Sequence, residues 1–509
     1  QRQMCIRDSY RPVSILPIMS KILERVVFLQ MIEYLEINNL LHANHHGFRS
    51  HHNTTTALIQ MYDYWIEDLE RKNYSGVCLI DMSAAFDMVN KELLLKKMEL
   101  YGFDHKSIKW IQNYLSDRKQ CASIDGIMSN FLNVSIGVPQ GSILSPIFYI
   151  LYTNDLPEIV HDNAASSYEG HQCDQCTKYD NLGNSVNAHV KIQQCDKCGE
   201  ICCFADDSTY SCSAKTSEEI TLKLKTKYDT ISEYLTSNRL KVNGDKTHLM
   251  VMMTDQARRS KHEFEISLEI DNELIETSNN EKMLGGIISE NLKWTQYIRD
   301  NKESLIKCLT TRLFALYKIC KIANFKTRKM IAEGIFTSKL IYLIPLWGGC
   351  EYYLIMSLQV LQNKAARAVT KASWYTPTQE LLNQCGWLSV NQLITYHSLV
   401  LVYKIIKSKK PVSMHNKLTS NNYVSNTRTW VYLKDGQYGS NLRIGPSKSA
   451  DHLLANRSFR WRSSKQWNNL PIEIRHSKSV NEFKMSLKAW IKTNVPLKPN
   501  NNTVAGNSA

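Results

Sequence analysis

The sequence lacks the features of a membrane protein and of a secreted disulfide scaffold. No uncharged apolar run reaches the roughly 18 residues that a membrane-spanning helix needs. The best candidate, Leu340 to Cys350, is short and contains Pro345. No signal-peptide pattern is visible, and most of the 14 cysteines are scattered, which fits a reducing compartment better than a disulfide framework. These absences favour an intracellular globular protein with no membrane partner, and 509 residues suffice for roughly two to four domains.

Acidic residues are scarce in the C-terminal part of the chain. Residues 301–509 contain 31 lysines and arginines but only 8 aspartates and glutamates, hence a net charge of +23. Because the whole chain carries +14, residues 1–300 carry −9. A basic region of this size indicates phosphate contacts and salt-dependent binding of nucleic acid, although a solvated basic surface has the same composition.

The first residues are not typical of a folded protein. Gln1 to Asp8 read as the translation of a transposase-type sequencing adaptor. We therefore exclude residues 1–9 from the prediction of the fold, and we expect the natural chain to continue upstream.

Two short apolar segments, far apart in the chain, each end in aspartates. Asp81 ends the strand-like run 77–81, and Asp206 and Asp207 follow Phe204 and Ala205. Nucleotidyl transfer uses two Mg²⁺ ions roughly 3.5–4 Å apart, each held by only one or two protein carboxylates. A single acidic pair is typical of a solvated turn, but two strands that deliver aspartates predict a magnesium site made of Asp81, Asp206 and Asp207. We expect Asp87, in contrast, to cap the following helix.

Seven short blocks follow one another along residues 10–290. The blocks are Arg11-Pro12-Val13-Ser14 through Glu24-Arg25, His46-Gly47-Phe48-Arg49-Ser50, Asp81 to Asp87, Gly137-Val138-Pro139-Gln140-Gly141-Ser142, Phe204-Ala205-Asp206-Asp207, Leu240-Lys241-Val242-Asn243 with Lys246-Thr247, and Leu284-Gly285. Their order and content resemble the fingers, palm and palm-to-thumb motifs of reverse transcriptases, most closely those of non-LTR (LINE-type, jockey-like) retrotransposons. The tail, with Gly386-Trp387-Leu388 and Trp467-Asn468-Asn469-Leu470-Pro471, resembles the tails of the same elements.

The resemblance implies an α+β right-hand polymerase with fingers, a palm with an antiparallel sheet, a helical thumb and a mostly helical basic C-terminal region. It implies RNA-directed DNA synthesis from a 3′-hydroxyl primer, with dNTPs as substrates and element RNA and a DNA primer or target DNA as partners. It also implies a ribonucleoprotein of the nucleus and cytoplasm. No endonuclease region or ribonuclease H signature is evident in the sequence.

The resemblance also assigns roles to single residues. It implies that Phe86 is a steric gate that excludes a 2′-hydroxyl and that Arg49 and Lys246 bind the triphosphate, with Lys246 as a general acid for pyrophosphate. Gln140 and Gly141 would contact the nascent base pair or the template, since glycine lets the backbone approach closely. As ordinary residues, Phe86 would be a core aromatic and the two cations would be solvated.

A cysteine cluster departs from the family pattern. Four cysteines follow the spacing CxxC-x18-CxxC in a segment that is longer than the usual link between the second and third palm motifs. This spacing predicts a closed structural Zn²⁺ site, with a metal-free, reduced loop as the alternative. His171, His189, Cys202 and Cys203 are possible substitute ligands, although Cys202 and Cys203 fit better in the strand before Phe204. The four predicted ligands are Cys173, Cys176, Cys195 and Cys198.

Hydrophobic periodicity predicts mostly helices outside the palm, among them 53–72, capped by Asn53 or Thr54. Asp125-Gly126 predicts a hairpin turn, and a basic loop with Arg258, Arg259 and Lys261 is expected between two later strands. The pattern 459–462, Phe-Arg-Trp-Arg, is typical of a nucleic-acid surface and equally of core aromatics beside exposed arginines. The predicted regions are 1–9 (adaptor), 10–76 (fingers), 77–290 (palm with the remaining fingers segments, including 160–203 as a zinc insert), 291–410 (helical thumb and C-terminal helices), 411–455 (polar connector), 456–495 (basic C-terminal module) and 496–509 (disordered tail).

Two alternatives to an active retrotransposon polymerase remain open. One is a polymerase that a host uses for another task. The other is a decayed copy that only binds RNA through the cysteine segment and the basic tail. The intact aspartates and the uninterrupted frame favour catalysis over decay.

Overall fold

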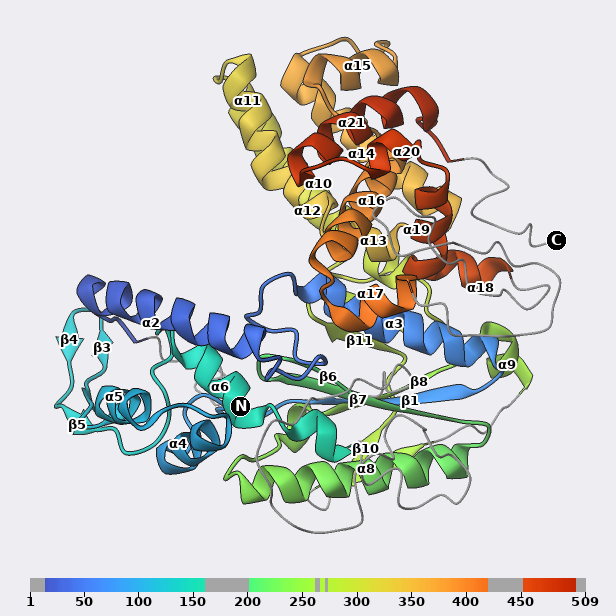
Figure 1. The fold of residues 1–509 in the computed structure, drawn as a ribbon. Coiled ribbons are helices and arrows are strands. Elements are labelled where there is room, and N and C mark those ends of the chain that lie inside the picture. The colour runs from blue at the N-terminus through green and yellow to red at the C-terminus, as the bar shows by residue number, and fades with distance from the viewer. Residues whose placement is uncertain (1–13, 161–200, 261–265, 271–272, 420–451, 500–509) are drawn as a thin grey trace.

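A four-stranded antiparallel sheet lies at the centre of the fold in the computed structural model, which describes residues 14–160, 201–260, 266–270, 273–419 and 452–499 (Figure 1). The strand order is β6-β7-β1-β8. β1 is central and pairs with β7 from Tyr74↔Ala214 to Ile80↔Ser208. The strands are β1 (Tyr74–Ile80), β6 (Ile201–Phe204), β7 (Asp207–Ala214) and β8 (His248–Met252).

Helices cover both faces of this sheet. α3 (Thr54–Glu70) lies on one face and α8 (Ser217–Ser237) on the other (Figure 1). Val77 and Cys78 are consecutive in β1 and are both fully buried, Val77 on the α3 side and Cys78 on the α8 side. Burial on both faces explains why this strand appears in the sequence as a continuous apolar run.

Helices and small hairpins form the fingers beside the sheet. The predicted hairpin turn at Asp125-Gly126 is confirmed, and both residues have positive φ, 50° and 84°, as a two-residue hairpin turn of type I′ requires. The elements are α2 (Ile18–Ile37), α4 (Lys91–Leu100), α5 (His105–Leu115), α6 (Ser145–Thr153), and the paired strands β2 (Lys119–Gln120) with β5 (Leu132–Asn133) and β3 (Ser123–Ile124) with β4 (Ile127–Met128).

Helix caps confirm one prediction and correct another. Asn53 caps α3, where its side chain accepts from the Thr56 backbone N–H and forms a capping box. Asp87, however, does not cap α4. Asn90 occupies that position and accepts from the Leu93 backbone N–H at 2.9 Å, because the chain makes a further turn before the helix begins.

The segments after β8 form short paired strands that lead out of the palm. The basic loop expected there is wrong in part, because Arg258 and Arg259 lie on a short helix, α9. The turn between β11 and β12 is Leu284-Gly285. A 3₁₀ helix, η1 (Gly244–Lys246), lies just before β8. The elements after β8 are α9 (Asp255–Ser260), β9 (Ser267–Ile270), β10 (Glu273–Glu276), β11 (Asn280–Met283), β12 (Gly286–Ser289) and the π-helical turn η2 (Gln296–Asp300).

The rest of the described chain is helical, as its periodicity predicts. The apolar stripe of α10 (Leu305, Leu309, Leu313, Leu316 and Cys320) is buried. Residues 412–419, expected in a polar connector, form a helix instead, and residues 420–451 lie outside the described part. The elements are α10 (Leu305–Cys320), α11 (Phe325–Ala332), η3 (Glu333–Thr337), α12 (Ser338–Leu340), α13 (Ile344–Trp347), α14 (Tyr352–Thr370), α15 (Thr378–Cys385), α16 (Val390–Ser408), α17 (Val412–Thr419), α18 (His452–Arg457), α19 (Phe459–Asn468), α20 (Ile472–Arg475) and α21 (Val480–Asn494).

Two hydrophobic cores meet at the sheet. One lies between the sheet, α8 and the fingers helices. The other begins at α3 and continues through α10 to α21, so that Trp65 of α3 and Trp467 of α19 belong to the same core. Among the described helices, none combines the length and apolarity of a membrane span.

Candidate active site

Strand pairing brings the predicted aspartates together. Asp81 directly follows β1 and Asp207 begins β7, next to the paired residues Ile80 and Ser208. Continuing this register places Asp81 opposite Asp207, and residues directly opposite in an antiparallel pair have Cα atoms roughly 4.5–5.5 Å apart. Asp206 lies in the two-residue turn between β6 and β7, where Phe204 pairs with Asp207. Three carboxylates that are far apart in the sequence thus lie at one end of the sheet.

Residues 44–47, which we call the fingers loop, pack directly against this turn. Ala205 has a positive φ of 57°. A Cβ on Gly47 would lie 2.6 Å from the backbone nitrogen of Ala205, so only glycine permits the contact. His46 N–H donates to the Cys203 carbonyl, and Cys203 N–H donates to the Asn44 carbonyl. Residues 44–46 therefore extend the sheet beyond β6 and support the turn that carries Asp206.

Phe86 belongs to the block 81–87 and is held in place by the block 137–142. Its carbonyl accepts from the Val138 N–H, and its half-buried ring lies 5.0 Å from the ring of Tyr149. Gly137 has a φ of 82°, and a Cβ there would lie 2.7 Å from the Asp87 carbonyl oxygen. The close backbone contact between the two loops fixes the position of the Phe86 ring.

Tyr149 connects this contact to the aspartates. Its hydroxyl donates to the sulfur of Met82 at 2.9 Å. Burial raises the pKa of Tyr149 well above its ordinary value, and the charge of Asp206 raises it further. Tyr149 is thus a neutral donor next to the acidic end of the sheet.

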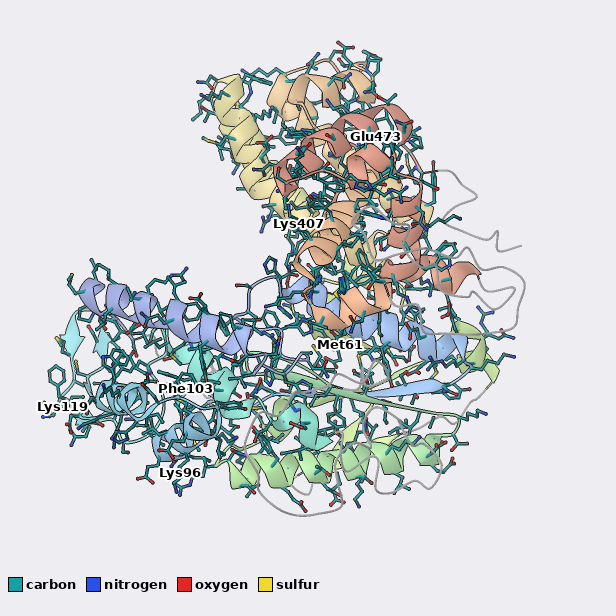
Figure 2. All side chains as sticks on the ribbon, viewed as in Figure 1. Met61, Lys96, Phe103, Lys119, Lys407 and Glu473 are labelled. Atoms are coloured by element: carbon teal, nitrogen blue, oxygen red, sulfur yellow. The ribbon has the colours of Figure 1, made fainter. Side chains whose placement is uncertain are left out.

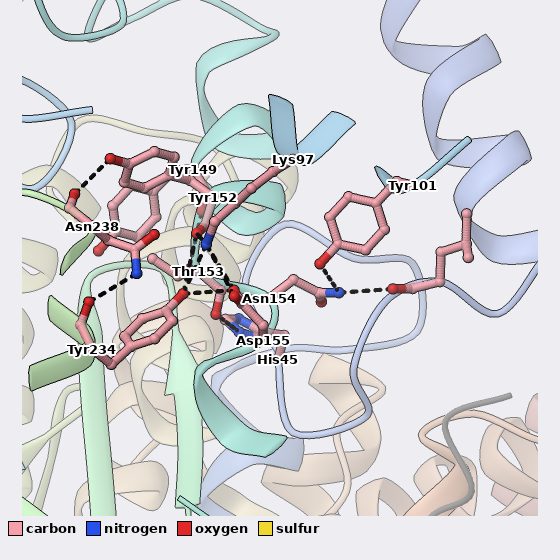
Figure 3. Close-up of polar contacts among 11 residues, drawn as sticks. His45, Lys97, Tyr101, Tyr149, Tyr152, Thr153, Asn154, Asp155, Tyr234 and Asn238 are labelled. Atoms are coloured by element: carbon pink, nitrogen blue, oxygen red, sulfur yellow. Dashed lines mark hydrogen bonds and ion pairs between the residues drawn. The ribbon is translucent and has the colours of Figure 1, made fainter. Parts of the chain in front are cut away.

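The C-terminal end of α6 is tied to three other elements (Figure 3). Lys97 of α4 forms an ion pair with Asp155 at 2.9 Å, and the Tyr234 hydroxyl of α8 donates to the same carboxylate at 2.6 Å. Asn154 accepts from the His42 N–H, and a ring nitrogen of His45 lies 3.0 Å from the Thr153 carbonyl oxygen. These contacts hold α6 against the loop that supports the Asp206 turn.

A buried glutamate anchors the loop that contains Gln140 and Gly141. Glu24 of α2 is 1% exposed and accepts from the hydroxyls of Tyr114 and Ser142 and from the Ile143 N–H. Gly141 has a φ of 113°, and the Gln140 carbonyl accepts from the Ser14 N–H. This role was not predicted from the sequence, where Glu24 appeared only as part of the first block. A signal was present, because Glu24 shares the buried stripe of α2 with Met31 and Leu35, a position unusual for an acidic residue.

The two predicted triphosphate ligands have different surroundings. Lys246 is exposed at the end of η1, three residues after Asn243, whose N–H donates to the Asp81 carbonyl at 2.9 Å. The Arg49 side chain is 7% exposed, pairs with Glu36 at 3.3 Å and donates to the carbonyls of His42 and His45. In this structure the Asn243 contact ties the turn that carries Lys246 to the backbone of Asp81, while the Arg49 guanidinium contacts protein groups. The triphosphate role of each residue stays a prediction.

Within the described residues, no group of three or more His, Cys, Asp or Glu side chains is arranged to hold a metal ion. Oxygen donors on neighbouring strands still suit Mg²⁺, which takes most of its ligands from phosphate and water. The predicted zinc ligands Cys173, Cys176, Cys195 and Cys198, with His171 and His189, lie outside the described residues. Cys202 and Cys203 are buried in β6, as expected for strand residues.

Comparison with known proteins matches the chain to one family over more than half of its length. The model of the family "Reverse transcriptase (RNA-dependent DNA polymerase)" matches residues 3–288. This range begins near the start of the chain and contains all three aspartates and the blocks 81–87 and 137–142.

Curated relatives support the same family. The chain is 26% identical, over 74% of its length, to "RNA-directed DNA polymerase from mobile element jockey" of Drosophila funebris. It is 24% identical, over 77% of its length, to "Probable RNA-directed DNA polymerase from transposon X-element" of Drosophila melanogaster. The chain spans 37% and 38% of these relatives. Among solved structures, apo telomerase from Candida Tropicalis aligns with a TM-score of 0.37 and 15% identity over 77% of this chain and 59% of that chain.

Proposed function

The chain belongs to the reverse transcriptase family, and from this premise we propose that it is the polymerase region of a non-LTR retrotransposon protein. It copies element RNA into DNA from a 3′-hydroxyl primer on DNA, with dNTPs as substrates, and acts as a ribonucleoprotein with the RNA that it copies. The observation that carries this proposal is the register of β1, β6 and β7, which sets Asp81 opposite Asp207 and beside the Asp206 turn.

The carboxylates of Asp81, Asp206 and Asp207 would hold two Mg²⁺ ions. Bound there, the ions would activate the primer 3′-oxygen and stabilise charge on the pyrophosphate. The protein contributes rigid placement, because β1 is paired with β7 along its whole length and the Gly47 contact supports the turn. Fixed geometry of this kind removes much of the entropic part of the barrier.

The remaining site residues would bind and select the nucleotide. Phe86, fixed by Val138 and Tyr149, would lie beneath the sugar and exclude a 2′-hydroxyl. Gln140 and Gly141 would contact the nascent base pair. Lys246 would bind the triphosphate and donate a proton to pyrophosphate. Arg49 would bind the triphosphate only after release from Glu36.

Primer extension tests the proposal directly. The substrate is RNA with an annealed DNA primer in Mg²⁺, with dNTPs and rNTPs offered separately. We expect extension with dNTPs only, loss of extension in Asp206→Asn, and normal extension in Asp229→Asn, an exposed aspartate on α8 that serves as the matched control. Folded wild-type protein that binds this RNA but does not extend the primer would contradict the proposal and favour the decayed, RNA-binding alternative.

We also propose a structural Zn²⁺ in the cysteine segment, on the strength of its paired CxxC spacing. The expected result is one zinc per chain in purified wild-type protein and none in the double variant Cys173→Ser/Cys198→Ser. The matched control is Cys308→Ser, which lies on α10. Wild-type protein without metal would refute the zinc site and leave the polymerase proposal unaffected.

A further inference from the structure

α3 carries a row of polar residues on the side that faces away from the sheet. Gln60, Asp63 and Glu67 follow helical spacing, so they share one face. Gln60 and Asp63 are each 5% exposed, and the Glu67 side chain is 21% exposed. Met61, also on α3, lies at the junction between the sheet and the C-terminal helices (Figure 2). Buried polar groups need partners, and within the described part of the chain these side chains find them in Asn44 and His46 and in residues beyond 410.

Gln60 joins the fingers loop to α17. Its amide nitrogen donates to the Asn44 side chain at 3.0 Å. Its amide oxygen accepts from the Ser413 hydroxyl at 2.7 Å and lies 3.1 Å from Nε2 of His46. Because this oxygen can only accept, Nε2 of His46 carries the hydrogen. Burial lowers the pKa of His46 well below its ordinary value, in agreement with a neutral ring.

Asn44 and His46, whose side chains contact Gln60, also bond to β6 through their backbones. The Asn44 carbonyl and the His46 N–H bond the two backbone groups of Cys203, three residues before Asp206. A short chain of contacts therefore runs from Ser413 through Gln60 and residues 44–46 to the aspartate hairpin.

Other contacts secure the same docking. Asp63 accepts from the backbone N–H groups of Phe459 and Arg460 at 2.8 and 3.0 Å, at the start of α19. Glu67 pairs with Arg460 at 3.0 Å. Phe459 is buried and Arg462 donates to the Pro345 carbonyl, which supports the core interpretation of this aromatic–basic pattern.

A second link reaches the same loop from its other end. Lys410, just before α17, pairs with Glu36 of α2, and Glu36 pairs with Arg49. Arg49 in turn donates to the carbonyls of His42 and His45. Lys410 thus contacts Glu36, and Ser413 contacts Gln60. Through these two residues the C-terminal region supports the loop next to β6 at both of its ends.

We propose that Gln60 and Ser413 are positioning residues, through which the helices beyond residue 410 set the geometry of the Asp206 turn. This inference rests on the proposed polymerase function. In this arrangement the C-terminal helices are part of the polymerase itself, and removing the Ser413 hydroxyl loosens the aspartate hairpin without touching substrate.

The first test is kinetic and compares Ser413→Ala with Ser413→Thr, Gln60→Ala and the double variant Gln60→Ala/Ser413→Ala. The matched control is Ser357→Ala, whose hydroxyl donates to the Tyr353 carbonyl within α14. We expect Ser413→Ala to lower kcat about three- to tenfold, with KM for the primer–template unchanged and the melting temperature preserved. Ser413→Thr restores kcat, and the double variant loses no more than Gln60→Ala, since the two residues act as one unit.

The second test does not depend on activity. Loss of one partly buried hydrogen bond is expected to speed amide hydrogen exchange at His46 and Cys203 about fivefold in Ser413→Ala, with no change in the control. Wild-type kcat and wild-type exchange in Ser413→Ala would overturn the inference, as would additive losses in the double variant. If wild-type protein extends no primer, the polymerase proposal fails, and the exchange result alone decides the coupling.

Discussion

Replacing Gly47 with alanine tests whether the fingers loop holds the aspartate hairpin. The added Cβ would lie 2.6 Å from the Ala205 nitrogen and 3.3 Å from its Cα. Ordinary contact begins at 3.4 Å, so the hairpin or the loop must move by about 0.8 Å. Both Ala205 atoms are backbone atoms of a turn held between paired strands, and neither can move aside by a change of rotamer.

A shift of this size has a predictable effect on rate. Misplacement of catalytic groups by about 1 Å lowers the rate roughly 100-fold, and overpacking costs about 1–3 kcal/mol of stability. We therefore expect Gly47→Ala to lower the single-turnover rate of nucleotide addition about 100-fold, with the Kd values for dNTP and primer–template changed less than threefold. The loss should appear in the chemical step because the alanine touches the turn that carries Asp206 and not the substrate.

The assay is single-turnover primer extension at saturating dNTP, with the melting temperature measured in parallel. Gly334→Ala is the matched control, since a Cβ there meets nothing within 4 Å. The double variant Gly47→Ala/Ala205→Gly should recover part of the rate, because glycine relaxes a turn residue that has positive φ. A folded Gly47→Ala protein with the wild-type rate would refute this account of the hairpin.

Three further predictions concern the gate, the buried glutamate and pH. Phe86→Ala should lower the discrimination between dNTP and rNTP about 10–200-fold in kcat/KM, while the exposed control Phe131→Ala should not; unchanged discrimination would remove Phe86 as the gate. Glu24→Ala should lower the free energy of unfolding by about 3 kcal/mol in denaturant titrations, because buried donors lose their acceptor, and a loss equal to that of the exposed control Glu33→Ala would contradict this. Burial lowers the pKa of His45 to about 4, so the unfolded chain binds more protons below pH 6.5. Acidification from pH 7 to pH 5 should therefore lower the free energy of unfolding by about 2 kcal/mol through His45. A His45→Gln variant that loses as much stability as the wild type over this pH range would disprove this contribution.

Local signals predicted the elements that depend on nearby residues. The continuous apolar run identified β1, Asn53 identified the start of α3, and Asp125-Gly126 identified a hairpin turn, because each pattern acts over a few residues. The α+β fold and the three aspartates followed from ordered motifs. Asp87 was misplaced as a cap because several polar residues precede α4, and only the backbone path shows that Asn90 is at the cap position.

Long-range partners could not be predicted from the sequence. Arginine is a common phosphate ligand, so the sequence suggested this role for Arg49. Its actual partners, Glu36 and the carbonyls of the loop 42–45, become apparent only in three dimensions. Gln60 and Ser413 are 353 positions apart, and neither belongs to a recognisable motif. The helix at residues 412–419 was missed because packing against α16 and α19 and polar contacts with α3, rather than its own weak periodicity, stabilise it.

The central position of β1 has a consequence during protein synthesis. This strand is the first of the sheet to be made, and both of its neighbours, β7 and β8, lie more than a hundred residues downstream. At about 5–20 residues per second, the ribosome needs roughly 6–25 s to add residues 81–207. Throughout that interval an apolar strand with two unpaired edges is available to other chains, a state that promotes aggregation. Production of this protein should therefore benefit from chaperones that shield residues 74–80 until β7 emerges.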